Sequence, residues 1–352
     1  MYKLIGAALF LIGAAAGYFC REPVSPYRLD YGRAVINLPI TYSHYLEDDL
    51  YALGEKYLAE DLAAALAEYG IEARLYTFED TFSNRNFYEG FEIYLRSGPE
   101  LLMSDYHDYA DKDRVAVLFE TIPYELREVK NADIVFTGSL KKDREYRAQG
   151  INSHFLPQFT RTEKFYPAPN DDYRTRILYV ANQWPDFGVR KTVAYAQKTG
   201  VRLAVFGDNW ENILTGASAM WWKMRQIAGD QLKYYYSSAD IVLNDTRPDM
   251  IEAGFVSNRI FDATACKAFV ISDYMPEIEE IYGDSVPMYR NEREFKALID
   301  YYLAHPEERR EKAERAYQIT MARFTADKII GQMAQIMKQY ADNLKGRDNG
   351  EK

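Results

Sequence analysis

Residues Ile241 to Asp273 read IVLNDTRPDMIEAGFVSNRIFDATACKAFVISD. The stretch begins with an apolar run that ends at Asn244, continues through a polar loop with glycine and proline, and resumes with a short helical segment opened by Ser257. It closes with β-branched and aromatic residues, which are typical of a second strand. The order strand, loop, helix, strand predicts one unit of a parallel sheet. In such a unit the helix begins at the carboxyl edge of the sheet, where ligands bind.

Polar side chains gather on one face of the helical segment. Asn258, Arg259 and Asp262 occupy neighbouring positions of that face, and the apolar residues between them are placed to pack. We therefore expect the polar face to look toward the ligand. Arg259 suits a diphosphate through charge-assisted hydrogen bonds, and Asp262 suits a pair of ribose hydroxyls. The alternative for this spacing is an Arg259–Asp262 ion pair on a solvated face, worth about 0.2–0.5 kcal/mol.

The N-terminus is an apolar run, Met1 to Cys20, bounded by charged residues. Its length is at the short end for a membrane span, which needs about 17–25 residues, and long for a signal-peptide core of about 7–15. No clean cleavage site precedes the charges, so we expect residues 1–22 to remain as a membrane anchor. Positive charge after the run exceeds that before it, which favours a cytoplasmic body. The alternative is a cleaved signal segment and a secreted or periplasmic product.

Composition indicates a globular body. The chain has 352 residues, of which 47% are hydrophobic, and a net charge of −10. This length suffices for two domains with cores of their own. The acidity argues against nucleic acid as a partner, because binding its phosphates needs a basic face. Two cysteines and four histidines without ligand-like spacing predict neither a disulfide framework nor a metal site.

Strand and helix patterns alternate through both halves of the chain. In the first half we expect strands at residues 33–38, 71–78, 91–95, 115–119 and 134–136. A segment rich in proline and aromatic residues, 154–169, is typical of a linker between domains. After it the alternation restarts, with strands at 177–180 and 201–206 before the opening stretch. The sequence therefore predicts two α/β domains, each with a mostly parallel sheet.

Several motifs occur in an order that resembles a known family. They are EIYLRSG (92–98), GINSHFLPQFTRTEKFYP (150–167), the strand 174–180 followed by Asn182 and Arg190, AVFGDNW (204–210), IVLN (241–244), GFVSNRIFDATACKAFVISD (254–273) and YYLAHPEERREKAERA (301–316). In this order they resemble the CgeB/YkvP-type glycosyltransferase-like family. The resemblance covers most of residues 33–340.

The resemblance implies the GT-B fold, in which two Rossmann-like domains face each other across a cleft. Residues 31–155 would form the N-terminal acceptor domain and residues 156–325 the C-terminal nucleotide-sugar domain. A last helix, 326–345, would cross back to the first domain. The implied activity is that of a glycosyltransferase of the hexosyltransferase type, with a nucleotide-sugar as co-substrate.

Two positions depart from what the resemblance implies. Asp262 stands where the family has a glutamate that is expected to bind the ribose of the donor. The carboxylate that many related enzymes carry eight residues earlier falls at Gly254, and Glu252 is the nearest substitute. These departures leave open a transferase relic that binds nucleotide without turnover.

The donor site is expected to use arginine rather than metal. Its predicted residues are Asn182, Arg190, Asn244, Ser257, Asn258, Arg259 and Asp262. Arg190 and Arg259 are the expected diphosphate contacts, assisted by N–H groups of the helix that begins near Ser257. Asn182 has the alternative of a turn residue, and Trp210 is expected to pack beneath a loop. Because no metal-binding carboxylate pair is evident, we expect no metal and no other cofactor.

The catalytic base is the least defined part of the prediction. Glu120 ends a buried strand of the first domain and is the first candidate; the alternative is a helix-capping or salt-bridging carboxylate. His44 lies in a loop and is the second candidate. Arg96 is expected to contact the acceptor or a phosphate, against a structural ion pair. The expected acceptor is an envelope glycan or its lipid-linked precursor, and the alternative from another class is a bilobal sugar-binding protein without catalysis.

Overall fold

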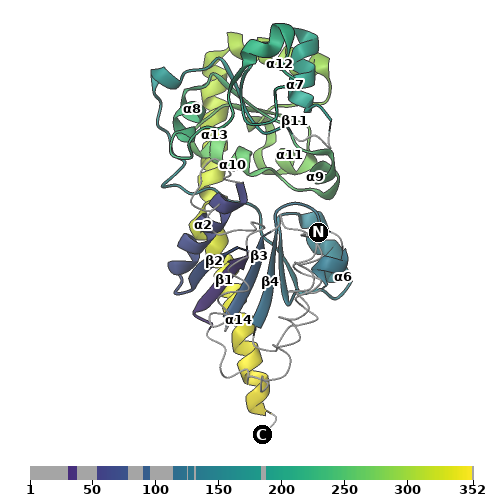
Figure 1. Ribbon diagram of the computed structural model, residues 1–352, viewed down its shortest axis with the longest axis vertical. Helices are drawn as coiled ribbons and strands as arrows, with labels where there is room; N and C mark the ends of the chain where they lie inside the picture. The colour runs from purple at the N-terminus through teal and green to yellow at the C-terminus, as the bar shows by residue number, and fades with distance from the viewer. Residues whose placement is uncertain are drawn as a thin grey trace, which may run out of the picture.

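The computed structural model describes residues 31–37, 54–77, 90–95, 114–124, 126–130, 132–183 and 188–350. Within these ranges the chain forms two lobes, each built around a parallel sheet of six strands (Figure 1). The two α/β units predicted from the alternating pattern are therefore confirmed.

The first sheet has the strand order β2-β1-β3-β4-β5-β6. Its strands are β1 (Arg33–Asn37), β2 (Glu72–Tyr76), β3 (Gly90–Leu95), β4 (Arg114–Glu120), β5 (Ile134–Thr137) and β6 (Ser153–Phe155). The helices of this lobe are α2 (Gly54–Ala67), α5 (Leu126–Val129) and α6 (Leu140–Ala148). Ser139 caps α6, because its Oγ accepts a hydrogen bond of 3.0 Å from the Lys142 N–H.

The second sheet has the order β12-β11-β10-β7-β8-β9. Its strands are β7 (Ile177–Val180), β8 (Ala204–Phe206), β9 (Trp222–Met224), β10 (Ile241–Asn244), β11 (Val270–Asp273) and β12 (Met288–Tyr289). The α-helices are α7 (Lys191–Thr199), α8 (Leu232–Ser238), α9 (Pro248–Ala253), α10 (Asn258–Ala265), α11 (Pro276–Tyr282), α12 (Glu292–Ala304) and α13 (Pro306–Arg323). Short 3₁₀ turns are η5 (Asp171–Tyr173), η7 (Gly216–Trp221) and η8 (Gly283–Ser285). The chain order reverses between β7 and β10, which are neighbours in the sheet. Such a reversal opens a crevice at the carboxyl ends of the two strands.

The last helix, α14 (Ala326–Gly350), returns to the first lobe and runs along it (Figure 1, yellow). Ile330, Met333 and Met337 are fully buried in the same core as the first sheet and α2. The Tyr69 hydroxyl at the end of α2 donates a 2.7 Å hydrogen bond to the carbonyl of Asp327. The predicted return of the final helix is confirmed.

The chain crosses between the lobes twice, and the two crossings pair with each other. The Thr160 N–H donates to the Phe324 carbonyl, and the Ala326 N–H donates to the Thr160 carbonyl, both at 2.9 Å. Elsewhere the Ser139 hydroxyl donates to the Ala253 carbonyl at 2.5 Å. Because Ser139 follows β5 and Ala253 lies beyond β10, the carboxyl edges of the two sheets face each other.

Parts of the structure differ from what the sequence predicted. The segment after Asn244 was expected to be a loop, but residues 248–253 form α9. Pro248 occupies the first turn of that helix, where its fixed φ is favourable, and Gly254 ends it at φ 82°. The short strands β6 and β9 at the sheet edges were not predicted. No helix in the described ranges is both long and apolar enough to span a membrane; the anchor predicted at residues 1–22 lies outside those ranges.

Candidate functional site

A buried carboxylate, Asp245, occupies the point where the strand order reverses. It follows β10 directly, and only 2% of the residue is exposed. Its Oδ1 accepts hydrogen bonds from the Tyr179 hydroxyl at 2.6 Å and from the Arg190 Nε at 3.0 Å. Its Oδ2 accepts from the Thr192 N–H, in the first turn of α7, at 3.1 Å. Asp245 therefore ties β7, β10 and α7 together at the carboxyl edge of the second sheet.

The charge of Asp245 is balanced by arginine. Burial by itself raises the pKa of this carboxyl, but Arg190 and then Arg259 outweigh burial and hold the pKa below its usual value of 3.8. The Arg190 Nη2 contacts Oδ1 at 2.5 Å and also donates to the Asp245 carbonyl at 3.1 Å. The Arg190 Nη1 donates to the Asn182 carbonyl at 3.3 Å. These bonds engage both ends of the Arg190 guanidinium.

Arg259 lies on the other side of the same cluster. Its Nη1 donates a 2.7 Å hydrogen bond to Oδ1 of Asn244, which is fully buried and itself donates to the Ser272 hydroxyl at 2.9 Å. The guanidinium carbons of Arg190 and Arg259 are each 5.9 Å from the centre of the Tyr179 ring. The structure gives the Arg259 Nε and Nη2 no hydrogen-bond partner among the described residues. Arg259 therefore retains donors for a ligand, whereas Arg190 is held mainly by the protein.

A second pair of opposite charges lies beside the first. The Lys191 Nζ contacts Oδ2 of Asp273, at the end of β11, at 2.9 Å. Asp273 is fully buried while 39% of the Lys191 side chain is exposed. Burial raises the pKa of Asp273, although Lys191 opposes that shift. Lys191 therefore adds a further cation to the carboxyl edge.

The helix α10 begins at this edge, as predicted. Ser257 takes the N-cap position, but its side chain makes no capping hydrogen bond. The first N–H groups of α10 are thus left without a side-chain cap, which favours an incoming anion. Arg259 does not pair with Asp262; Asp262 instead accepts a 2.8 Å hydrogen bond from the Asn258 amide. The solvated ion pair considered as the alternative is not formed.

Asn182 and Trp210 shape the loops after β7 and β8. The Asn182 Oδ1 accepts a 2.9 Å hydrogen bond from the Asp208 N–H. Trp210 is fully buried, and its indole N–H donates to the Ala181 carbonyl at 2.8 Å. The expectation that Trp210 packs beneath a loop is confirmed. Asn182 therefore acts as a turn residue, which was the alternative considered for it. Its contact with the nucleotide-sugar donor stays a prediction.

Asp262 lies apart from the arginine cluster and near the junction of the lobes. It is 9% exposed, and burial raises its pKa to about 8, with a smaller contribution from the charge of Asp61 on α2. One carboxylate oxygen is bound by Asn258, and the other lies beside the Thr160 hydroxyl without hydrogen-bond geometry. This oxygen is buried and has no hydrogen-bond partner among the described residues, so the ribose contact of Asp262 stays a prediction that requires the oxygen to become exposed.

The Asp262→Asn variant is expected to be more stable than the wild type at alkaline pH. The folded-state pKa is raised, so between about pH 4 and pH 8 the native state binds more protons than the unfolded state, and stability falls as the pH rises. Asparagine removes the buried charge and should add about 1–3 kcal/mol to the free energy of unfolding at pH 9, with no gain at pH 4. Urea unfolding at both pH values measures this, with the exposed Asp230→Asn as the matched control. Parallel pH profiles for wild type and Asp262→Asn would contradict the prediction.

Glu120 ends β4 at the edge that faces the second lobe, but its side chain is fully buried. Its Oε1 accepts hydrogen bonds from the Tyr124 N–H at 3.0 Å and from the Tyr146 hydroxyl at 2.8 Å. Burial raises the pKa of Glu120, and these hydrogen bonds oppose the rise. In this arrangement Glu120 is a buried structural carboxylate that binds the turn before α5 and the Tyr146 hydroxyl of α6. Its part in catalysis stays a prediction that requires the side chain to become exposed.

The other predicted residues of the first domain, His44 and Arg96, lie outside the described residues. Among the described ranges, no three His, Cys, Asp or Glu side chains come together as a metal site would require.

The geometry at Gly254 explains why no carboxylate stands there. Its φ of 82° disfavours any residue with a side chain, and an added Cβ would lie 2.8 Å from Oε1 of Glu277. Glu277, in the first turn of α11, therefore places a carboxylate beside Gly254. Glu252 is exposed, and its carbonyl accepts a 2.8 Å hydrogen bond from Lys141 of the first lobe.

The sequence did not single out Asp245, Lys191, Tyr179 or Asp273. One signal was present, because Asp245 and Asp273 each stand at the carboxyl end of a predicted strand, where ligand-binding side chains collect. Lys191 directly follows Arg190. Tyr179 gave no signal, since an aromatic residue inside a strand is typical of a core.

Comparison with known proteins agrees with this architecture. Residues 189–335 match the family described as glycosyl transferase-like. The chain is 33% identical over 232 residues to the spore protein CgeB of Bacillus subtilis, a match that covers 60% of this chain and 70% of that protein.

Solved structures share the fold at low sequence identity. Sucrose-phosphate synthase from Thermosynechococcus elongatus superposes with a TM-score of 0.63 at 14% identity, covering 87% of this chain and 98% of that one. Anabaena Alr3699/HepE in complex with UDP and glucose gives a TM-score of 0.63 at 11% identity. This match covers 87% of this chain and 99% of that one. The two facing lobes and the returning helix are those of the GT-B fold. The chain belongs to the glycosyltransferase-like family of the CgeB type, and it is a glycosyltransferase.

Proposed function

We propose that the protein transfers a sugar from a nucleoside-diphosphate sugar to a glycan acceptor, and that it does so without a metal ion. The observation that carries the proposal is the cluster of Arg190, Arg259 and Asp245 at the strand-order reversal of the second sheet. Nucleotides bind beside such reversals in open parallel sheets, and the two guanidinium groups suit a diphosphate.

The chemistry assigns different tasks to the two arginines. The anomeric carbon gains a bond to the acceptor oxygen and loses its bond to the diphosphate oxygen, and the proton of the acceptor hydroxyl passes to a general base or to the departing diphosphate. Negative charge therefore develops on the departing diphosphate. Arg259, with unused donors, stabilises that charge directly, and Arg190, whose charge is paired with Asp245, holds β10 and α7 in position beside it. In this proposal Asp262 binds the ribose hydroxyls through its second carboxylate oxygen, which is buried in the free protein and becomes exposed when the donor binds.

The acceptor side of the proposal rests on the N-terminus. If residues 1–22 anchor the body at the cytoplasmic face of a membrane, an envelope glycan or its lipid-linked precursor lies within reach. Mass spectrometry of the mature protein tests this assignment of the acceptor. Retention of residues 1–22 supports it, and cleavage after them overturns it.

A thermal-shift screen of the protein against UDP-, GDP-, ADP-, CMP- and dTDP-sugars tests the donor site. UDP-sugars come first because Anabaena HepE, which has the same fold, was solved with UDP and glucose. A ligand at a hundred times its dissociation constant should add about 2.7 kcal/mol to stability. We expect one nucleotide class to stabilise the wild type, with the shift lost in Arg259→Ala and Asp262→Asn.

Turnover is then measured as release of the nucleoside diphosphate, with and without EDTA. Equal rates in the two arms are the expected result, because arginine replaces the metal in neutralising the diphosphate. Loss of turnover in EDTA, restored by a divalent cation, would contradict metal independence. A shift with free sugars but with no nucleotide would favour a sugar-binding protein, and nucleotide binding without turnover would favour a relic.

A further inference from the structure

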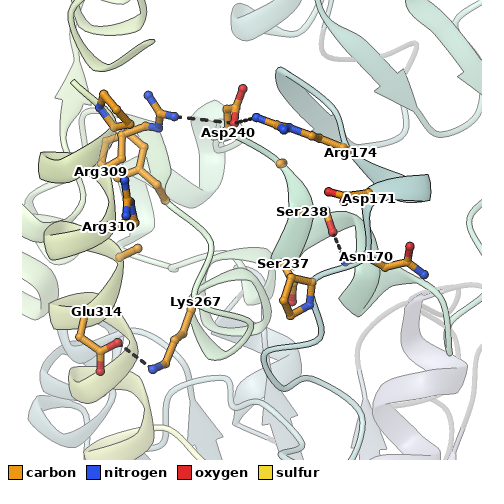
Figure 2. A pocket seen from close by; sticks show the side chains of 15 residues that line it. Asn170, Asp171, Arg174, Ser237, Ser238, Asp240, Lys267, Arg309, Arg310 and Glu314 are labelled. Carbon is orange, nitrogen blue, oxygen red and sulfur yellow. Dashed lines mark hydrogen bonds and ion pairs between the residues drawn. The ribbon is translucent and has the colours of Figure 1, made fainter. Parts of the chain in front are cut away.

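A groove with a volume of about 740 Å³ lies at the amino edge of the second sheet (Figure 2). Three of its lining residues stand just before strands: Arg174 precedes β7, Asp240 precedes β10 and Phe269 precedes β11. All strands of this sheet are parallel, so the groove and the Arg259 cluster lie at opposite edges. The groove is therefore separate from the proposed donor site.

The walls of the groove are polar. The first half of α13 supplies Arg309, Arg310 and Glu314, and the end of α8 supplies Ser237 and Ser238. Its ionisable side chains are four basic and three acidic: Arg174, Lys267, Arg309, Arg310, Asp171, Asp240 and Glu314. Arg310 is paired with Glu307 and Lys267 with Glu314, so Arg174 and Arg309 are the basic side chains that face Asp240.

Two arginines in the groove share a single carboxylate. Figure 2 shows Arg174 and Arg309 reaching Asp240 from opposite sides, with distances of 3.5 and 3.7 Å to the same Oδ1. Charge-assisted hydrogen bonds are shorter, about 2.7–2.9 Å. Neither guanidinium is therefore fully satisfied by Asp240. The Arg309 Nη1 also donates to the Tyr302 carbonyl, so its other N–H groups are the ones that a ligand can use.

Arg309 is the more constrained of the two. Only 13% of its side chain is exposed. Burial lowers its pKa; Asp240 opposes the shift, while the charges of Arg310 and Arg174 add to it. A bound anion would relieve this crowding of positive charge.

We propose that this groove binds a small organic phosphate whose oxygens bridge Arg174 and Arg309. Guanidinium groups match the oxygens of a phosphate in pairs, and the volume of the groove accommodates a sugar phosphate or a nucleotide. The Lys267–Glu314 ion pair, at 2.7 Å, lies at one end of the groove. Its two charges already neutralise each other without a ligand. The site is independent of the donor site and of the transfer reaction.

Hydrogen-exchange mass spectrometry of the full chain, with and without inorganic pyrophosphate, tests the groove. We expect slower exchange in residues 237–241 and 306–314. This protection should persist in Arg259→Gln, which weakens the donor site. In the Arg174→Gln/Arg309→Gln double variant the dissociation constant for pyrophosphate at the groove should rise about tenfold or more.

Two further variants keep the test decisive if the double variant fails to fold. The Arg310 side chain is 70% exposed, so Arg310→Gln should fold normally and still weaken the protection. Arg293→Gln, an exposed change on α12, should leave the protection unchanged. Protection confined to residues 244–262, or protection reproduced by sodium chloride at equal ionic strength, would overturn the proposal.

Discussion

Replacing Arg259 with glutamine is expected to lower kcat/KM for the nucleotide-sugar by about 10²–10³-fold. Asn244 holds one amino group of Arg259 at 2.7 Å and leaves the other donors of the guanidinium to the ligand. Glutamine keeps some hydrogen-bonding capacity but loses the charge. Because negative charge develops on the diphosphate in the transition state, the loss should fall mainly on kcat. Steady-state release of the nucleoside diphosphate measures both constants.

Two controls separate charge from structure. Arg259→Lys keeps the positive charge but not the forked geometry, so it should recover part of the lost rate. Arg293→Gln removes an exposed arginine from α12 and should leave both constants unchanged. A normal kcat/KM in a correctly folded Arg259→Gln variant would exclude Arg259 from the transfer step.

The Asp245→Asn variant is expected to lose about 3–5 kcal/mol of stability, because it leaves a buried arginine without its counter-charge. Only 12% of the Arg190 side chain is exposed, and its strongest contacts are with the Asp245 carboxylate. The same change removes one of the hydrogen bonds that hold Tyr179 and α7 in place. Denaturant unfolding of both proteins at pH 7 gives the difference.

The pH dependence of this loss has a defined sign. The pKa of Asp245 is lower in the folded state than its usual value of 3.8, so its contribution to stability is present above that value and is lost as the pH falls through the folded pKa. The difference between wild type and Asp245→Asn should therefore shrink in strong acid.

A double-mutant cycle with Arg190→Gln tests the coupling itself. The double variant should be less destabilised than the sum of the two single variants. Asp249→Asn is the matched control: Asp249 pairs with Arg247 near the surface, where such pairs contribute about 0–1 kcal/mol. Additive losses in the cycle would show that Asp245 and Arg190 are not coupled.

The sequence predicted the fold well because its signals are local. The spacing of apolar residues located most strands of both sheets to within a few residues of their observed bounds. The helix expected to begin at Ser257 is also present. The helix α9 was not predicted, although Pro248 and Gly254 mark its two ends, because its polar residues are typical of a loop. Strands β6 and β9, with three residues each, are too short to carry a period of their own.

The candidate site was predicted in part. The structure brings Arg190, Asn244 and Arg259 together within one hydrogen-bonded cluster, and it places Asp262 away from them. On a helix, Arg259 and Asp262 occupy neighbouring positions, yet their side chains reach different partners because the two sides of α10 face different elements. Spacing alone gives the face of a helix but not what lies opposite it.

Apolar patterns within short stretches of the chain predicted the alternation of strands and helices and the division into two α/β halves. The return of the last helix was expected from the family resemblance alone, because it depends on packing against α2 and the first sheet, far away in the sequence. Three contacts could not be predicted from local patterns: Asp245 binds Arg190 from 55 residues away, Glu120 turns into its own lobe, and Arg174 and Arg309 share Asp240. The physical reason is that the charge state and partners of a buried polar group are set by neighbours in space, and burial makes those partners far more consequential than they are in water.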